Sequence, residues 1–183
     1  MLEDNELIEL FQQGEIQVFE ILVERYSSRI INFLYRLCWH RELAEDLAQE
    51  SFIKLYRSLN RYETEGNFKA YMFTIAKNVW IDFLRSKKGK TELKKQAGDS
   101  EIIFENLKST EPSVEDMVYY KEKLELLETT VNQLSEEQKM VFMLYHDDMK
   151  YAEIAEILSI PEGTVKSRLH HAFNKIKKVL FEE

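Results

Sequence analysis

Residues 151–172, YAEIAEILSIPEGTVKSRLHHA, decide the fold of the second half of the chain. Their first part places apolar side chains on one face of a short helix: Ile154, Ala155 and Leu158. Ser159 and Ile160 follow as a turn, and Pro161 takes a first helical position, where a missing N–H is tolerated. Apolar residues then recur every three or four positions: Val165, Leu169, Ala172, Ile176 and Val179. The pattern predicts a helix-turn-helix whose second helix buries one face.

The opposite face of that second helix carries hydrogen-bond donors and cations: Thr164, Lys166, Ser167, Arg168, His170 and His171. Such side chains suit a helix that enters the major groove of DNA. A helical hairpin with an ordinary solvated face has the same pattern. This segment alone therefore leaves both interpretations open.

The composition favours a helical protein that functions in a reducing compartment. Of 183 residues, 44% are apolar and 32% are charged, and only five are Gly and two are Pro. The single cysteine, Cys38, excludes an internal disulfide and fits the cytoplasm. No apolar run approaches the roughly 20 residues that span a bilayer, and the acidic start MLEDNELIELF does not match a secretory signal. We expect a soluble, cytoplasmic protein.

Two basic segments lie in an otherwise acidic chain of net charge −8. Residues 69–98 hold eight Lys or Arg against two Asp or Glu, and residues 161–178 hold five against one. The two segments that separate the basic ones, residues 99–128 and residues 129–160, are acidic. Because phosphate neutralisation supplies most non-specific DNA affinity, we expect weak binding of free duplex and a need for a second partner.

The apolar periodicity predicts an all-α fold of two small helical domains joined by a flexible linker. The first domain, residues 1–88, is expected to have helices over 4–13, 17–39, 42–59 and 67–87. A polar, Gly- and Pro-punctuated linker covers 89–113. The second domain, residues 114–183, is expected to have four helices, over 114–132 and 135–145 and in the helix-turn-helix. Ser135 and Gln138 form the capping box that begins the second of these.

Three segments, in this order and spacing, give the chain a specific resemblance. They are AEDLAQESFIKLYRSLNRY at 44–62, FKAYMFTIAKNVWIDFLR at 68–85 and LSEEQKMVFMLYHDDMKYAEIAEILSIPEGTVKSRLHHAFNKIK at 134–177. Over nearly its whole length the chain resembles the bacterial sigma factors of the small, two-domain extracytoplasmic-function group of the sigma-70 family. The resemblance implies a subunit that binds core RNA polymerase, directs it to promoters and opens the DNA. It implies no catalytic site, metal or cofactor.

The resemblance places polymerase docking on the segment that carries Asp46, Gln49, Glu50 and Phe52. The first three share a predicted helix face opposite Leu43 and Leu47, where acid and amide groups suit a basic partner surface. Without the flanking segments, an ordinary solvated face would explain them better than docking would.

The resemblance also implies that the promoter element near the start site is bound as a melted single strand, with one base flipped into a pocket. A flipped base loses its base pair and its stacking in the duplex, so the protein must stack on the base and hydrogen-bond to its edge. The candidate residues are Tyr62, Glu65, Asn67, Tyr71, Phe73, Lys77, Asn78, Trp80 and Arg85. Phe68 belongs to the inward apolar stripe, so we expect it in the core.

The distal promoter element would be bound as duplex by the second helix of the helix-turn-helix. The matching residues are Glu162, Gly163, Thr164, Lys166, Ser167, Arg168 and His171. Family members commonly have arginines where this chain has His171 and Phe173. An imidazole makes a shorter and weaker phosphate contact than a guanidinium, so the resemblance does not carry over the family's base contacts at these positions.

The resemblance further implies an anti-sigma partner, in the family often anchored in the membrane, although this chain is not expected to be a membrane protein. A stand-alone helix-turn-helix repressor or activator is the alternative, but such proteins pair subunits and no dimer helix is evident. An enzyme such as a carboxylate-metal nuclease is disfavoured because the four histidines have no ligand spacing with Cys38.

Overall fold

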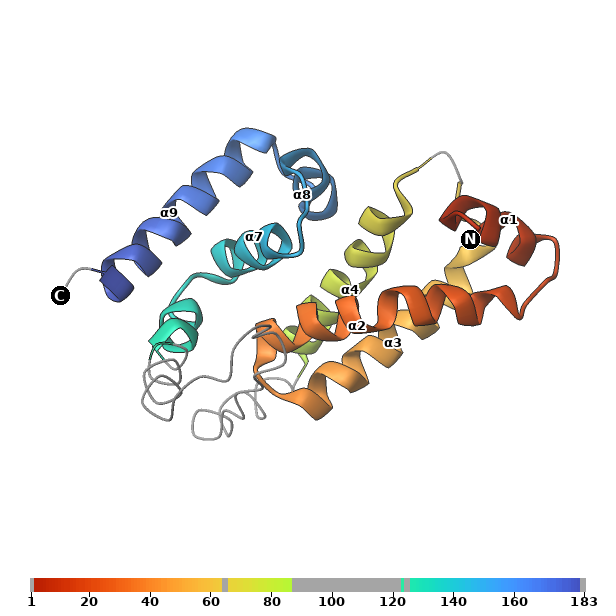
Figure 1. Ribbon diagram of the computed structural model, residues 1–183, viewed down its shortest axis with the longest axis horizontal. Coiled ribbons are helices and arrows are strands. Elements are labelled where there is room, and N and C mark those ends of the chain that lie inside the picture. The colour runs from red at the N-terminus through yellow and green to blue at the C-terminus, as the bar shows by residue number, and fades with distance from the viewer. Residues whose placement is uncertain (1, 64–65, 87–122, 124–125, 182–183) are drawn as a thin grey trace, which may run out of the picture.

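The computed structural model describes residues 2–63, 66–86, 123 and 126–181, and every regular element in these ranges is a helix (Figure 1). The N-terminal domain consists of α1 (Asp4–Gln12), α2 (Val18–Cys38), α3 (Arg41–Leu59) and α4 (Phe68–Arg85). The C-terminal domain contains helical residues 126–132, then α7 (Glu136–His146), α8 (Tyr151–Leu158) and α9 (Glu162–Phe181). The prediction of two helical domains with a helix-turn-helix is confirmed, while the predicted linker lies outside the described residues.

Polar side chains fix where the helices begin. The His40 Nδ1 atom accepts a hydrogen bond from the Leu43 N–H at the start of α3, and the Asn67 side chain accepts one from the Ala70 N–H at the start of α4. The predicted capping box of Ser135 is present at α7. These bonds satisfy N–H groups that have no partner within the helix.

The core of the N-terminal domain lies where α2 packs against α3 and α4. The Phe33 ring meets the Phe73 ring edge-on, with centroids 5.3 Å apart. Phe68 packs between the rings of Tyr26 and Tyr62, so its predicted place in the core is confirmed.

The helix-turn-helix is present as predicted, but the buried residues of α8 and the first residue of α9 differ slightly from the prediction. Ser159 adopts a left-handed conformation, with φ of 54°, and turns the chain between α8 and α9. Ile157 is buried with Ile154, whereas the predicted Ala155 and Leu158 are only half-buried. Leu158 turns toward the N-terminal domain, which the helical period of α8 alone does not reveal. α9 begins one residue after Pro161, whose carbonyl accepts from the Val165 N–H.

The two domains pack directly against each other. α8 lies against α4, and α7 lies against both α2 and α9 (Figure 1). None of the helices in the described ranges has the length and apolar character needed to cross a membrane.

Cys38, at the end of α2, gives a chemical test of this packing. Its side chain is 6% exposed, its thiol donates to the His40 carbonyl at 3.3 Å, and burial raises its pKa from 9.0 to about 11. At pH 8 the thiolate fraction is therefore about 100-fold below that of an exposed cysteine. We expect Ellman's reagent to react slowly with the native protein and rapidly in guanidinium.

The raised pKa of Cys38 also makes the stability of the fold depend on pH. A folded-state pKa above the unfolded value stabilises the fold below pH 9, and this stability is lost as pH rises toward 11. Rapid native labelling at pH 8, or a chemical-denaturation midpoint that rises between pH 9 and 11, would contradict the burial of Cys38.

Candidate nucleic-acid interface

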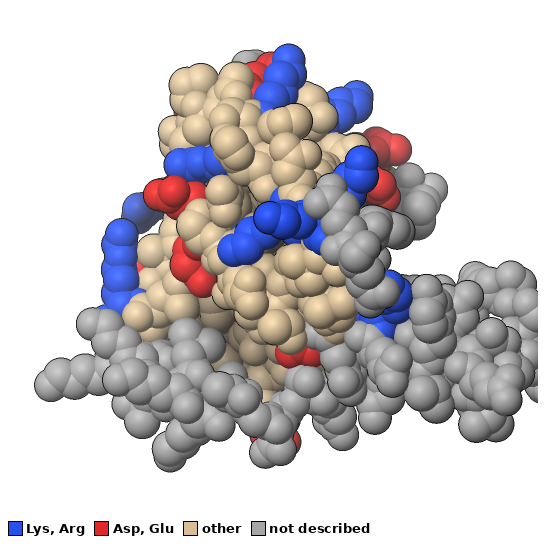
Figure 2. Space-filling model, turned by 90° about the vertical axis from the view of Figure 1, so that its left-hand side faces the viewer, with Lys and Arg blue, Asp and Glu red and all other residues tan. Residues whose placement is uncertain are grey.

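The outer face of α9 carries most of the residues predicted for distal duplex binding. Glu162, Gly163, Lys166, Ser167 and His171 are exposed. The opposite side of the helix is buried through its apolar stripe: Val165, Leu169, Ala172 and Ile176. Figure 2 shows the side of the molecule that lies on the left in Figure 1, and Lys and Arg side chains spread over its upper part. This surface presents cations and hydrogen-bond donors from one rigid helix.

An exposed aromatic cluster lies beside these residues and was missed in the sequence. The ring of Phe173, 43% exposed, meets the rings of Phe142 and Tyr145 edge-on, and Tyr145 lies 6.0 Å from Tyr151. The Lys166 ammonium lies 5.8 Å from the centre of the Tyr151 ring. The aromatics come from the end of α7, the start of α8 and the middle of α9, so no single helical period reveals the cluster.

Arg168 and Thr164 are half-buried, unlike their neighbours on α9. The Arg168 guanidinium lies 3.5 Å from a carboxylate oxygen of Glu137 on α7. Arg168 therefore faces the inside of the C-terminal domain as much as solvent. Of the two cations Lys166 and Arg168, Lys166 is the more exposed.

The residues predicted for the melted element divide by exposure. Asn67, Asn78 and Arg85 are exposed, and Tyr62, Tyr71 and Lys77 are half-buried. Phe73 and Trp80 are buried in this arrangement, so neither ring is available for stacking on a base. Glu65 lies outside the described residues.

Two tyrosines on the N-terminal domain form a partly exposed aromatic pair. The rings of Tyr62 and Tyr71 are 4.6 Å apart and inclined by 38°. The Tyr71 hydroxyl donates to the Ser58 hydroxyl at 2.8 Å, which fixes the second ring. The pair is a partly open aromatic surface of this domain, and the Tyr71 N–H donates to the Asn67 carbonyl at 3.0 Å.

The predicted docking face on α3 is exposed at its polar positions. Asp46, Gln49 and Glu50 lie at the surface, while Phe52 is buried and supports the helix from within. Ile53 is 51% exposed and follows Gln49 by one helical turn. Sequence reasoning missed it because a single isoleucine between polar residues gives no periodic signal.

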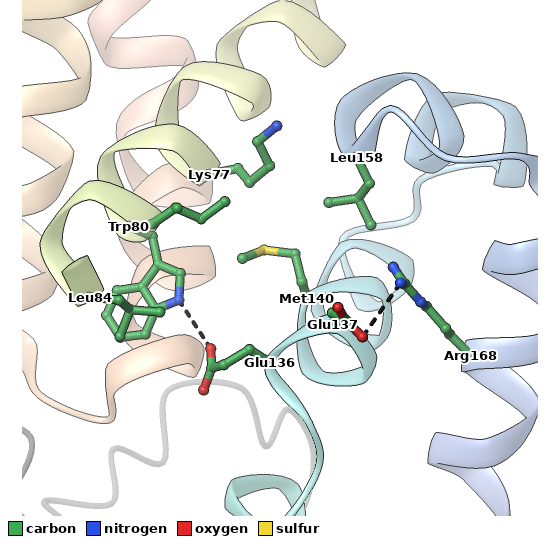
Figure 3. A pocket seen from close by; sticks show the side chains of 9 residues that line it. Lys77, Trp80, Leu84, Glu136, Glu137, Met140, Leu158 and Arg168 are labelled. Carbon is green, nitrogen blue, oxygen red and sulfur yellow. Dashed lines mark hydrogen bonds and ion pairs between the residues drawn. The ribbon is translucent and has the colours of Figure 1, made fainter.

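A hollow of about 200 Å³ lies between the domains (Figure 3). Lys77, Trp80 and Leu84 line it from α4, and Met140 and Leu158 line it from the C-terminal domain. The Trp80 indole N–H points toward a Glu136 carboxylate oxygen at 3.4 Å. Within the described residues, no group of His, Cys, Asp and Glu side chains is arranged to hold a metal ion.

Family models match both domains. The model described as Sigma-70 region 2 matches residues 22–90, and the model described as Sigma-70, region 4 matches residues 124–176. The first covers α3, α4 and most of α2, and the second covers the helix-turn-helix.

Characterised relatives match along almost the whole chain. The chain is 30% identical over 176 residues to the ECF RNA polymerase sigma factor SigW of Bacillus subtilis, with 94% of each chain covered. It is 28% identical over 183 residues to the RNA polymerase sigma-H factor of Pseudomonas aeruginosa, covering 97% of this chain and 94% of that one.

Solved structures share the fold. CnrH in complex with the cytosolic domain of CnrY superposes with a TM-score of 0.69 at 19% identity, covering 97% of this chain and 96% of that chain. The sigma factor RpoE of Bartonella quintana, in complex with the anti-sigma factor NepR, gives 0.69 at 20% identity, covering 90% and 98%. On the sequence matches, the chain belongs to the extracytoplasmic-function group of the sigma-70 family, the non-enzymatic subunits that direct bacterial RNA polymerase to promoters.

Proposed function

We propose that the outer face of α9 binds the distal promoter element as duplex. The observation that carries this proposal is the exposure of Lys166, Ser167 and Gly163 on a helix whose other side is anchored in the core. Helices placed this way present their N-terminal residues to base edges in the major groove. Glu162 and Thr164 stand at the same end, while Arg168 and His171 extend the surface along the helix.

The N-terminal domain is proposed to hold the melted element near the start site. Asn78 offers an amide for a base edge, and Arg85 offers a cation for phosphate. Asn67, Lys77 and the Tyr62–Tyr71 pair lie on the same domain and supply further polar and aromatic contacts. The buried Phe73 and Trp80 act by shaping α4.

The exposed side of α3 is proposed as the docking face for core polymerase. Asp46, Gln49 and Glu50 provide polar contacts, Ile53 adds an apolar one, and Phe52 holds the helix in place from the core. A stand-alone repressor is not favoured, because region 2 would have no role in it.

The partners and the compartment follow from this role. We propose that the chain works in the cytoplasm with core RNA polymerase and promoter DNA. An anti-sigma factor is proposed as its inhibitor, since the similar structures of CnrH and RpoE are complexes with CnrY and NepR. Membrane anchoring of such an inhibitor is part of the same proposal.

The duplex surface is tested by replacing its freest cation. Lys166→Ala should lower promoter-directed transcription by roughly tenfold, because a contact to base or phosphate is lost. Binding to core polymerase should stay unchanged in size-exclusion chromatography. Lys177→Ala, an exposed lysine further along α9, is the matched control and should retain most activity. Equal losses in both variants would show that only the overall charge of α9 matters.

The docking face is tested by charge reversal. Asp46→Arg should reduce binding to core polymerase by at least tenfold, because an exposed acid that faces a basic surface becomes a repelling cation. Glu24→Arg, at an exposed position of α2, makes the same charge change elsewhere, and this variant should bind core polymerase normally. Circular dichroism should show both variants folded. Normal core binding by Asp46→Arg would remove α3 from the interface.

A further inference from the structure

The first helix of the chain holds the turn that follows α3. The Gln12 side chain, on the last residue of α1, donates one hydrogen bond to the Leu59 carbonyl at 3.0 Å and another to the Tyr62 carbonyl at 2.9 Å. α1 also packs against α3 (Figure 1). Gln12 therefore joins two segments that lie 47 to 50 positions apart in the sequence.

The amide of Gln12 suits these two acceptors for a chemical reason. A side-chain amide carries two N–H donors on one nitrogen, so a single group can serve two carbonyls. Leu59 ends α3, where carbonyls have no partner within the helix, and its oxygen also accepts from the Tyr62 N–H at 3.2 Å. Gln12 thus fixes both ends of the turn, residues 59–62, against α1.

The turn carries an aromatic ring to which the proposed function gives a contact with the melted strand. The centre of the Tyr62 ring lies 4.6 Å from that of Tyr71 and 5.7 Å from that of Phe68. A Cβ atom at Gly66 would come within 3.0 Å of the Tyr62 hydroxyl, so the ring also lies close to this glycine. A shift of the turn would therefore move the ring against its neighbours.

The two tyrosines of the pair are fixed in different ways. The Tyr71 hydroxyl donates to the Ser58 hydroxyl, so its side chain is anchored at its tip. The Tyr62 hydroxyl is buried and has no hydrogen-bond partner among the described residues. The position of the Tyr62 ring therefore depends on its packing and on its backbone, and Gln12 binds the carbonyl of that backbone.

We propose that Gln12 is a positioning residue for the melted promoter element. It holds the turn so that the Tyr62 ring stays where it favours one stacked base, and it does not itself touch the DNA. The assignment of Tyr62 as a DNA ligand rests on the proposed function. Contacts of this kind lose selectivity when their supporting residues allow a shift of about 1 Å. α1 would thereby contribute to promoter selection, although it lies outside the segments 22–90 and 124–176 that match the family models.

The test measures base preference within one reaction. Start sites are first mapped with core polymerase and the unmodified chain on genomic DNA. One strong promoter is then made in versions that carry each of the four bases at every position of its two elements. All versions are transcribed together, because a lower fraction of active protein then changes every yield alike and leaves the ratios between templates unchanged.

Two variants remove the donors of Gln12 in different ways. Gln12→Met replaces the amide with an apolar group of similar length, and Gln12→Glu keeps the shape but replaces the donors with acceptors. Each should lower the preference for the best base at the proximal element by about fivefold, the factor that corresponds to one ordinary hydrogen bond, since Gln12 lies at the surface. The preference at the distal element should stay unchanged. Gln13→Met, at the exposed next residue, is the matched control and should retain both preferences.

Amide hydrogen exchange examines the turn without DNA. The Arg61 N–H donates to the Ser58 carbonyl at 2.9 Å, and the Tyr62 N–H donates to the Leu59 carbonyl. In the free full-length chain, both amides should exchange about fivefold faster in Gln12→Met than in the unmodified protein or in the control variant. Circular dichroism should show native helix content in every variant.

Several results would overturn the proposal. Unchanged exchange at Arg61 and Tyr62 would show that Gln12 does not hold the turn. Faster exchange with an unchanged proximal preference would show that the turn does not position the ring for DNA. Equal losses at the proximal and distal elements would show a general defect. A loss in Gln12→Glu alone would assign the effect to the added negative charge and not to the lost donors.

Failure of the proposed function would look different. In that case the unmodified chain with core polymerase would show no base preference at the proximal element, and the role of Gln12 in promoter selection would fall with it. The exchange rates of Arg61 and Tyr62 would still report whether Gln12 holds the turn.

Discussion

The arrangement of the two domains depends on positive charge placed at the negative ends of helices. An ammonium group buried as deeply as that of Lys139 loses nearly all its hydration, so it is tolerated only where carbonyl and amide oxygens replace water. The end of α2 supplies one such oxygen, and a residue of the C-terminal domain supplies another. The bond therefore has a direction and a partner, which a purely apolar interface between the same helices would not specify.

The alternating charge of the chain follows the same logic. A sigma factor needs cations for DNA, yet an exposed excess of cations would favour binding to any nucleic acid. Here acidic segments separate the basic ones in sequence, and within the described residues α8, which belongs to the acidic segment 129–160, packs against α4. The net charge of −8 thus conceals two basic segments, residues 69–98 and residues 161–178. In the first, Lys77 donates to the Ile157 carbonyl of the C-terminal domain, whereas in the second Lys166 is exposed.

The two DNA surfaces differ in how they are built. On α9 the residues that hold the helix in the core and the residues that are candidates for DNA contact lie on opposite sides. Val165 and Leu169 are buried on one side, and Lys166 and Ser167 are exposed on the other. On the N-terminal domain the candidate residues come from α4 and the segment before it, and several of them also serve the core or the interface. Function and packing are therefore separable at Lys166 and Ser167 on α9, whereas Lys77 on α4 is both a candidate DNA ligand and a contact to the C-terminal domain.

Local chemistry in the sequence determined the helices, their starts and the helix-turn-helix. The apolar period, the Ser135 capping box and the low content of Gly and Pro are local features of the sequence. They predict helices without knowledge of the tertiary contacts. The exposed face of α9 and the buried place of Phe68 were predictable for the same reason. Only the tertiary structure decided that Trp80 is covered, that Leu158 faces α4 and that Lys139 reaches Leu37. Those outcomes depend on pairs of residues up to 102 positions apart, and no periodicity within one helix records which distant helix end a lysine will meet.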